Sequence, residues 1–229
     1  MMKFSKLLVL TLTMALILVG MTACQSDDGH TDANTGYCDM IEINKEIDSM
    51  RVGDFEETTN VTEYVKFTVK DYGTFVIRLR PDVAPITVDN FQQLVSKGFY
   101  NGLTFHRVIK DFVIQGGDPD GNGRGGSKNT IKGEFASNGV TNQLSHITGV
   151  ISMARLGSDP NSATSQFFIC NSNAAYSLDG SYAGFGYVVA GLETVYSISD
   201  AEVVINGSGE VSYPVTPVVI EKIVFVEKK

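Results

Sequence analysis

Apolar and polar residues alternate along two neighbouring stretches of the chain. From Val65 to Val69, and again from Phe75 to Leu79, every second residue is apolar. Asp71-Tyr72-Gly73 lies between the two stretches, and a turn flanked by alternating stretches is typical of a β-hairpin. The pattern therefore predicts two paired strands.

Two other stretches carry apolar residues at helical spacing. In the first, Thr87 is the expected N-cap and Gly98 the expected residue after the helix. The second follows Gly191. The apolar positions are Val88, Phe91, Leu94 and Val95 in the first stretch, and Leu192, Val195, Tyr196 and Ile198 in the second. Each set falls on one helical face, which predicts two amphipathic helices.

Most of the remaining chain consists of short β-like runs separated by glycine-rich turns. These runs are Thr104–Val108, Phe112–Gln115, Val150–Ala154, Gln166–Cys170, Tyr187–Val189 and Val218–Val226. Many short strands with two isolated helices favour a mainly β fold, namely a closed barrel capped by the helices.

The N-terminal residues resemble an export signal. Lys3 and Lys6 precede an apolar run from Leu7 to Gly20, which is shorter than the roughly 20 residues of a spanning helix. The next four residues, Met21-Thr22-Ala23-Cys24, resemble the lipobox of bacterial lipoproteins, in which the cysteine is acylated and the chain is cut before it. We therefore expect residues 1–23 to be a lipoprotein signal peptide and Cys24 to carry a lipid that anchors the protein outside the cytoplasm on a bacterial membrane. An ordinary secretory signal is the alternative.

Acidic residues dominate the segment that follows, residues 24–60. It holds few large apolar side chains, so we expect a flexible acidic tether, although Met40–Met50 is compatible with a short strand or helix. Removing residues 1–23, which hold Lys3 and Lys6 and no acid, takes the net charge from −8 to −10. Because phosphate backbones require a basic surface, no nucleic-acid partner is expected. Residues 61–229 remain as one domain.

Several longer motifs of this domain occur in a characteristic order. They are Phe105-His106-Arg107-Val108-Ile109, Phe112-Val113-Ile114-Gln115-Gly116-Gly117-Asp118, Gly149-Val150-Ile151-Ser152-Met153-Ala154, Ser165-Gln166-Phe167-Phe168-Ile169, Leu178-Asp179-Gly180 and Phe185-Gly186. Together they resemble the cyclophilin family from about Tyr64 to Val226. The resemblance implies an eight-stranded antiparallel barrel with two capping helices, and peptidyl-prolyl cis/trans isomerisation as the activity.

The chemistry of that reaction explains which residue types are needed. Amide resonance opposes rotation about an X–Pro bond with a barrier of about 20 kcal/mol. No covalent bond is made or broken, so we expect neither a cofactor nor a metal. An apolar slot for the proline ring and a donor that stabilises the twisted amide suffice. Arg107 suits the second task, because its guanidinium stays protonated and presents donors from a fixed plane.

The resemblance also implies a role for each matching residue. Arg107, Gln115 and Phe112 match the catalytic positions. The matching substrate-binding positions are Phe105, Val113, Ala154, Arg155, Gln166, Phe168, Leu178 and Tyr182. Ser177 and Tyr182 depart from the tryptophan and histidine of many eukaryotic relatives, so the resemblance does not carry cyclosporin binding over to this chain.

We expect proline-containing polypeptides as partners and a monomeric protein. A proline-peptide-binding chaperone with incidental catalysis is the alternative function. Gly121–Gly126 has the spacing of a dinucleotide-binding loop, but no helix pattern follows it. Asp118 and Asp120 begin an EF-hand-like run, but Asn129 replaces the final glutamate, so calcium is not expected.

Overall fold

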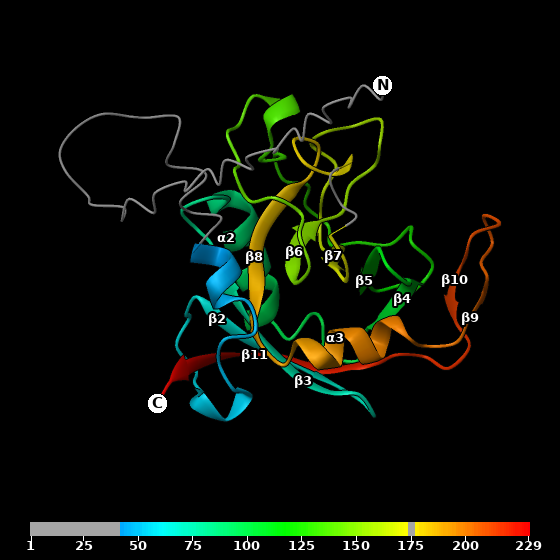
Figure 1. Cartoon of the computed structure of the whole chain (residues 1–229). Coiled ribbons are helices and arrows are strands. Elements are labelled where there is room, and N and C mark those ends of the chain that lie inside the picture. Colours follow the sequence, from blue (N-terminus) through cyan, green and yellow to red (C-terminus); the bar gives the residue numbers. More distant parts are fainter. Residues whose placement is uncertain (1–41, 174–176) are drawn as a thin grey trace, which may run out of the picture. The chain divides into compact units, whose positions relative to one another are not determined.

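The computed structural model describes residues 42–173 and 177–229. Its main feature is a nine-stranded antiparallel sheet of order β1-β11-β2-β3-β8-β6-β7-β5-β4, accompanied by the two-stranded hairpin β9–β10 (Figure 1). The strands of the large sheet are β1 (Phe55–Glu57), β2 (Tyr64–Val69), β3 (Gly73–Leu79), β4 (Thr104–Ile109), β5 (Val113–Asp118), β6 (Val150–Met153), β7 (Phe167–Cys170), β8 (Ala183–Ala190) and β11 (Ile220–Lys228). The hairpin strands are β9 (Val203–Ile205) and β10 (Val211–Pro214), the helices are α2 (Pro85–Ser96) and α3 (Leu192–Ser199), and the 3₁₀ turns are η1 (Val52–Asp54) and η2 (Ala136–Asn138).

The first predicted hairpin is confirmed as β2–β3. Phe67 pairs with Phe75 across the two strands, and their stacked rings have centroids 4.6 Å apart. Asp71 and Gly73 take φ angles of 65° and 121° in the connecting turn. Glycine suits the second position, because it adopts positive φ without a Cβ clash.

The mainly β architecture is confirmed, but the expected strand number is not. The large sheet has nine strands instead of eight, because β1 adds to β11 through the pair Phe55–Lys228. Within the described residues, no ladder of named strands joins the edge strands β1 and β4. The start of β4 instead approaches the residues around Val219, where the Phe105 N–H donates to the Val218 carbonyl at 2.9 Å.

Both predicted helices are present in the described part of the chain. Helix α2 begins at Pro85 with Ala84 as the N-cap, so the predicted cap at Thr87 is wrong. Proline is favoured in the first turn, since its missing N–H would be unpaired there anyway. Thr87 instead donates its N–H and hydroxyl to Glu134, at 2.8 and 2.7 Å. In α3, Tyr196 is 45% exposed and lies off the buried face.

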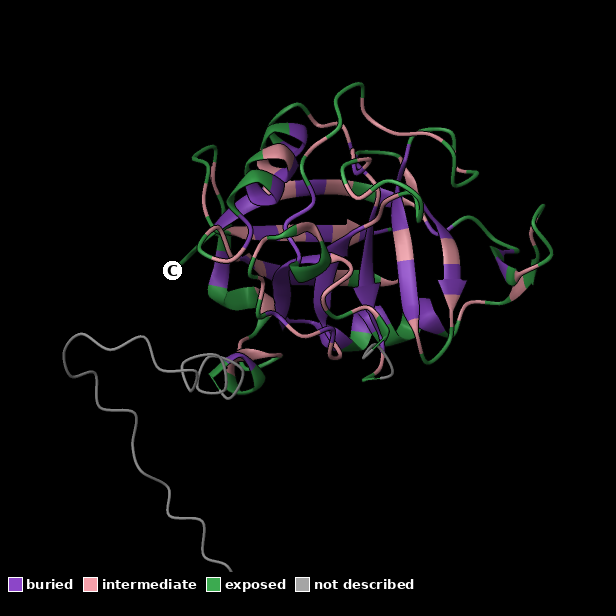
Figure 2. Cartoon of the chain, turned by 90° about the horizontal axis from the view of Figure 1, so that it is seen from above, coloured by how far each residue is buried: buried purple, intermediate pink, exposed green. Residues whose placement is uncertain are grey.

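Aromatic side chains fill the interior that the sheet encloses. Phe91 of α2 packs against Phe67, Phe167 and Phe185, with ring centroids 6.4, 5.9 and 5.2 Å apart. The strands are buried along much of their length, as Figure 2 shows in purple. Because this interior is occupied by side chains, a binding site on these strands has to lie on the outer surface of the sheet.

The structure corrects the predicted tether over part of its length. Residues 42–46 are helical, and Ile43 and Phe55 are only 3% and 5% exposed. Glu46 accepts hydrogen bonds from Arg78, at 2.8 and 2.9 Å, and from the Tyr187 hydroxyl. The packed region therefore begins before residue 61. Residues 24–41, with the predicted lipid site at Cys24, lie outside the described residues.

Two histidines are buried in this fold. His146 is 3% exposed and His106 is 6% exposed. Burial lowers the pKa of both imidazoles, because desolvation penalises the charged form, and for His146 this outweighs the opposite effect of Asp179. In the neutral form, the His146 Nδ1–H donates to Asp179 at 2.8 Å, and Nε2 accepts the Ser152 hydroxyl proton at 2.9 Å.

Replacement of Phe55 tests the packing of the early segment. Phe55→Ala removes a buried ring, so we expect the free energy of unfolding to fall by about 3 kcal/mol. Denaturant unfolding measures this change. Glu56→Ala, on the exposed side of the same strand, should change it by less than about 0.5 kcal/mol. Equal stability of the Phe55→Ala and Glu56→Ala proteins would mean that β1 does not pack in solution.

The buried histidines predict a pH-dependent stability. Both pKa values lie below the ordinary 6.5 in the folded state, so the unfolded chain takes up protons that the folded chain does not. The free energy of unfolding should therefore fall as the pH drops from about 7 to about 5 and stay level above about 7. Denaturant unfolding at several pH values measures this slope, which should be smaller in His146→Asn. An unchanged free energy between these pH values would contradict neutral burial.

Candidate functional site

The pairing of three neighbouring strands places two predicted catalytic residues, Arg107 and Gln115, beside the predicted substrate-binding residue Phe168. Arg107 of β4 lies opposite Gln115 of β5, and Gln115 lies opposite Phe168 of β7. Directly opposed residues of adjacent strands project from the same face of a sheet. The strand register therefore forms a row of one cation, one amide and one aromatic ring on the outer face.

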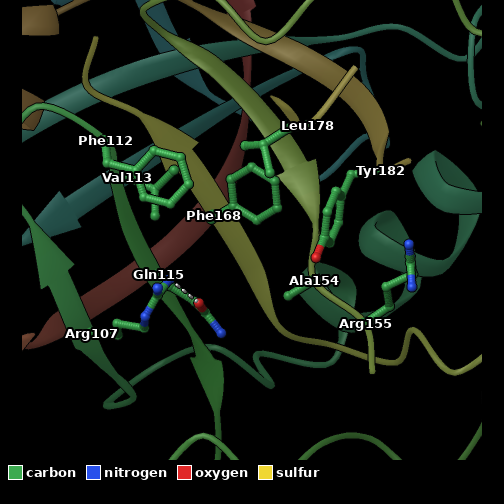
Figure 3. Close-up of a pocket in the computed structure, with 9 residues that line it drawn as sticks. All are labelled: Arg107, Phe112, Val113, Gln115, Ala154, Arg155, Phe168, Leu178 and Tyr182. Carbon is green, nitrogen blue, oxygen red and sulfur yellow. Dashed lines mark hydrogen bonds between the residues drawn. The ribbon is translucent and has the colours of Figure 1, made fainter. Parts of the chain in front are cut away.

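This row borders a small pocket of ≈160 Å³. Nine of the eleven predicted catalytic and substrate-binding residues line it: Arg107, Phe112, Val113, Gln115, Ala154, Arg155, Phe168, Leu178 and Tyr182. Figure 3 shows the apolar side chains of Phe112, Val113, Phe168 and Leu178 gathered on one side, with Arg107 and Gln115 next to them. The pocket thus combines an apolar wall with a polar one.

A chain of side-chain hydrogen bonds fixes the polar wall. Arg107 donates from Nη1 to Gln115 Oε1 at 3.1 Å, and Gln115 donates from Nε2 to Gln166 Oε1 at 2.9 Å. Gln166 in turn donates to the Gly125 carbonyl at 2.7 Å. Gln166 does not line the pocket itself. It borders an adjacent cavity together with Ala154 and Arg155.

Phe168 is the centre of the apolar wall. Its ring meets Tyr182 edge to face at 5.6 Å and stacks on His146 at 5.8 Å. The hydrogen bonds of His146 to Asp179 and Ser152 hold that supporting imidazole in place. Asp179 directly follows Leu178, so the same contacts also restrain the backbone at a second residue of the wall.

Arg155 lies at the rim of the pocket, on the opposite side from Arg107 (Figure 3). Its Nε donates to the Ser181 carbonyl at 2.9 Å. Its guanidinium also lies 4.8 Å from the centroid of the Tyr182 ring, within the range of a cation–π contact. These contacts direct the Arg155 side chain toward Tyr182 and leave Arg107 as the cation beside the aromatic wall.

The predicted role of Phe105 in substrate binding is wrong. Its side chain is fully buried, and it packs edge to face against Phe167 in the core at 6.0 Å. The pairing of β4 with β5 shifts register between Phe105 and Arg107. Such a bulge reverses the faces to which the following side chains point. Phe105 therefore points into the core, whereas Arg107 points to the pocket.

One further residue contacts the predicted catalytic arginine and was missed in the sequence. Glu210 pairs with Arg107 through Nε at 2.7 Å and Nη2 at 2.8 Å. It belongs to the turn of the β9–β10 hairpin. Asn206-Gly207 directly after the β-branched run Val203–Ile205 is a turn signal, but it does not indicate where the hairpin packs.

No group of three or more His, Cys, Asp or Glu side chains within residues 42–173 and 177–229 is arranged to hold a metal ion. The same residues contain no helix long and apolar enough to cross a membrane.

Comparisons with known proteins agree with this geometry. The model of the cyclophilin type peptidyl-prolyl cis-trans isomerase family matches residues 64–224. The chain is 44% identical over 137 residues to peptidyl-prolyl cis-trans isomerase B of Bacillus subtilis. The aligned region makes up 60% of this chain and 91% of that protein.

Solved structures of the same family are also similar to this chain. A crystal structure of a Cryptosporidium parvum cyclophilin type peptidyl-prolyl cis-trans isomerase is 31% identical with a TM-score of 0.63, covering 73% of this chain and 98% of that one. A second crystal structure of that protein, in the presence of the dipeptide Ala-Pro, is 31% identical with a TM-score of 0.62, covering 71% and 98%. From the family match, the relatives and the fold together, we conclude that the chain belongs to the cyclophilin family and is a cyclophilin-type peptidyl-prolyl cis-trans isomerase.

Proposed function

We propose that this isomerase accelerates rotation about X–Pro bonds in exported proteins, and that it does so at a membrane surface to which a lipid on Cys24 anchors it. The observation that supports the site most directly is the position of Arg107 beside the aromatic wall of the pocket. Proline-containing polypeptides are the proposed partners, and the protein acts as a monomer.

The pocket suits the reaction in size and in chemistry. A volume of ≈160 Å³ accommodates a proline ring, while the rest of a polypeptide lies across the surrounding surface. Phe112, Phe168 and Leu178 offer the ring an apolar environment, which favours its transfer from water. If the pocket holds the proline ring while the preceding residue turns, rotation is confined to the X–Pro bond, and no covalent step is needed.

Arg107 supplies the electrostatic part of the catalysis. As the amide twists, conjugation is lost and the proline nitrogen regains a lone pair. A permanently protonated donor aimed at the peptide unit stabilises this state more than the planar one, which lowers the barrier. Gln115 holds Nη1 of the arginine and is proposed to bond the substrate backbone, and Ala154 and Arg155 form the edge along which that backbone runs.

The proposed location depends on the first two dozen residues. Lys3 and Lys6, the apolar run up to Gly20 and the Met21-Thr22-Ala23-Cys24 sequence support export and acylation. Each buried methylene of a lipid chain contributes about 0.8 kcal/mol to membrane binding. Several acyl chains on one cysteine would hold the isomerase domain at the membrane without a spanning helix.

Arg107→Ala tests the catalytic proposal. We expect kcat/KM for a proline-containing peptide to fall by about 100-fold, because a positioned donor is lost from the transition state. A protease-coupled isomerisation assay measures the rate. Arg51→Ala, which removes an exposed arginine that does not line the pocket, should keep the wild-type rate. An Arg107→Ala protein as active as wild type would refute the assigned role.

Cys24→Ser tests the lipid anchor. Wild-type protein expressed in bacteria should partition into the detergent phase and sediment with membranes, because its acyl chains prefer an apolar environment. The Cys24→Ser protein should stay in the aqueous phase with the same isomerase activity. Cys170→Ser serves as the control, since Cys170 is buried in the domain. Aqueous partitioning of wild type would show that no lipid is attached.

A further inference from the structure

Glu210 occupies a defined edge of the Arg107 guanidinium. Its two carboxylate oxygens accept from Nε at 2.7 Å and from Nη2 at 2.8 Å, so the contact is bidentate. Gln115 accepts from Nη1 at 3.1 Å. A guanidinium has five N–H donors in one plane. Glu210 uses two of them and Gln115 one, which leaves one N–H on each of Nη1 and Nη2.

The turn that carries Glu210 is braced by its own hydrogen bonds. Asn206 Oδ1 accepts from the N–H groups of Ser208 and Glu210, at 2.9 and 3.0 Å. Asn206 also donates from Nδ2 to the hydroxyl of the buried Ser212 at 2.9 Å. Strand β10 packs against β4, the strand of Arg107 (Figure 1). The turn of the β9–β10 hairpin therefore holds the Glu210 carboxylate in a fixed position beside Arg107.

Without this contact the arginine has space to move. Arg107 and Gln115 line the proline pocket and also a larger cavity of ≈790 Å³ on the hairpin side, which Glu210, Asp120 and Arg124 border as well. Asp120 offers an alternative anionic partner in that cavity. Side chains as long as arginine lose considerable rotational entropy when they are held in one conformation, so a restraint is needed to keep the guanidinium at the pocket.

We propose that Glu210 is a positioning residue for the isomerase reaction: its bidentate contact fixes the guanidinium plane so that the two remaining N–H groups of Arg107 face the substrate. This inference rests on the proposed catalytic role of Arg107. Charge-assisted bidentate pairs are suited to the task, since they define orientation as well as energy. The Arg107 hydrogen bond also holds the pKa of Glu210 below its usual value, which keeps the carboxylate ionised.

Glu210→Gln provides the test, because the amide is nearly isosteric but can accept at only one of its two terminal atoms. We expect kcat to fall between about 5-fold and about 50-fold with KM within about twofold, as misplacement of a catalytic group costs up to on the order of 100-fold in rate. Exchange NMR at several concentrations of an Ala-Pro peptide separates kcat from KM. Glu202→Gln, which removes an exposed carboxylate just before β9, should match wild type in both constants.

A spectroscopic readout and a double variant complete the design. The Arg107 Nε–H signal, assigned by its loss in Arg107→Ala, should shift in Glu210→Gln and stay unchanged in Glu202→Gln. In an Arg107→Ala background, Glu210→Gln should have no additional effect on kcat. Wild-type kcat or a raised kcat in Glu210→Gln, with Arg107→Ala inactive, would overturn this inference alone. An active Arg107→Ala protein would overturn the proposed role of Arg107 together with it.

Discussion

The bulge in β4 determines where the chemistry of this protein is placed. In a regular strand Phe105 and Arg107 would project from the same face, because side chains alternate with a period of two. The register shift between them sends Phe105 into the core and Arg107 to the outer face. An arginine directed inward would be an unpaired charge among aromatic rings, which is strongly unfavourable. One local irregularity thus satisfies the packing of the core and supplies the pocket with its cation.

The packed interior of the protein supports the pocket on its outer surface. Aromatic rings occupy the space enclosed by the sheet, and this packing makes the strands a rigid support for side chains on the outer surface. Bond rotation requires no acid, base or nucleophile, which is consistent with the proposed site, a rigid row of one donor and several apolar contacts. The hydrogen bond between the buried His146 and the partly exposed Asp179 has a similar role, because it holds in place the imidazole that stacks on Phe168.

Local patterns in the sequence predicted those parts of the fold that depend on local interactions. Alternation identified β2 and β3, and helical spacing identified α2 and α3, although the Thr87 cap was wrong because Glu134, distant in sequence, binds that residue. The pairing of β1 with β11 joins the two ends of the described chain and has no local signal. The same holds for Glu210, since nothing in its own turn indicates that β10 packs on β4. Phe105 was misassigned because a motif match does not show a bulge.

The cation that we propose to be catalytic, Arg107, has to meet two opposing requirements. It must be restrained, because a freely moving guanidinium would spend little time aimed at the amide, yet it must keep donors available for the substrate. Arg107 and Glu210 are both partly exposed, with 27% and 36% of their side-chain surface accessible, so neither charge pays the full cost of burial. Glu210 takes the Nε edge and Gln115 takes one Nη1 donor. One N–H on each of Nη1 and Nη2 keeps no partner among these two residues, and these are the donors that we propose to face the substrate. Under this proposal, some atoms of the guanidinium are restrained while others stay available.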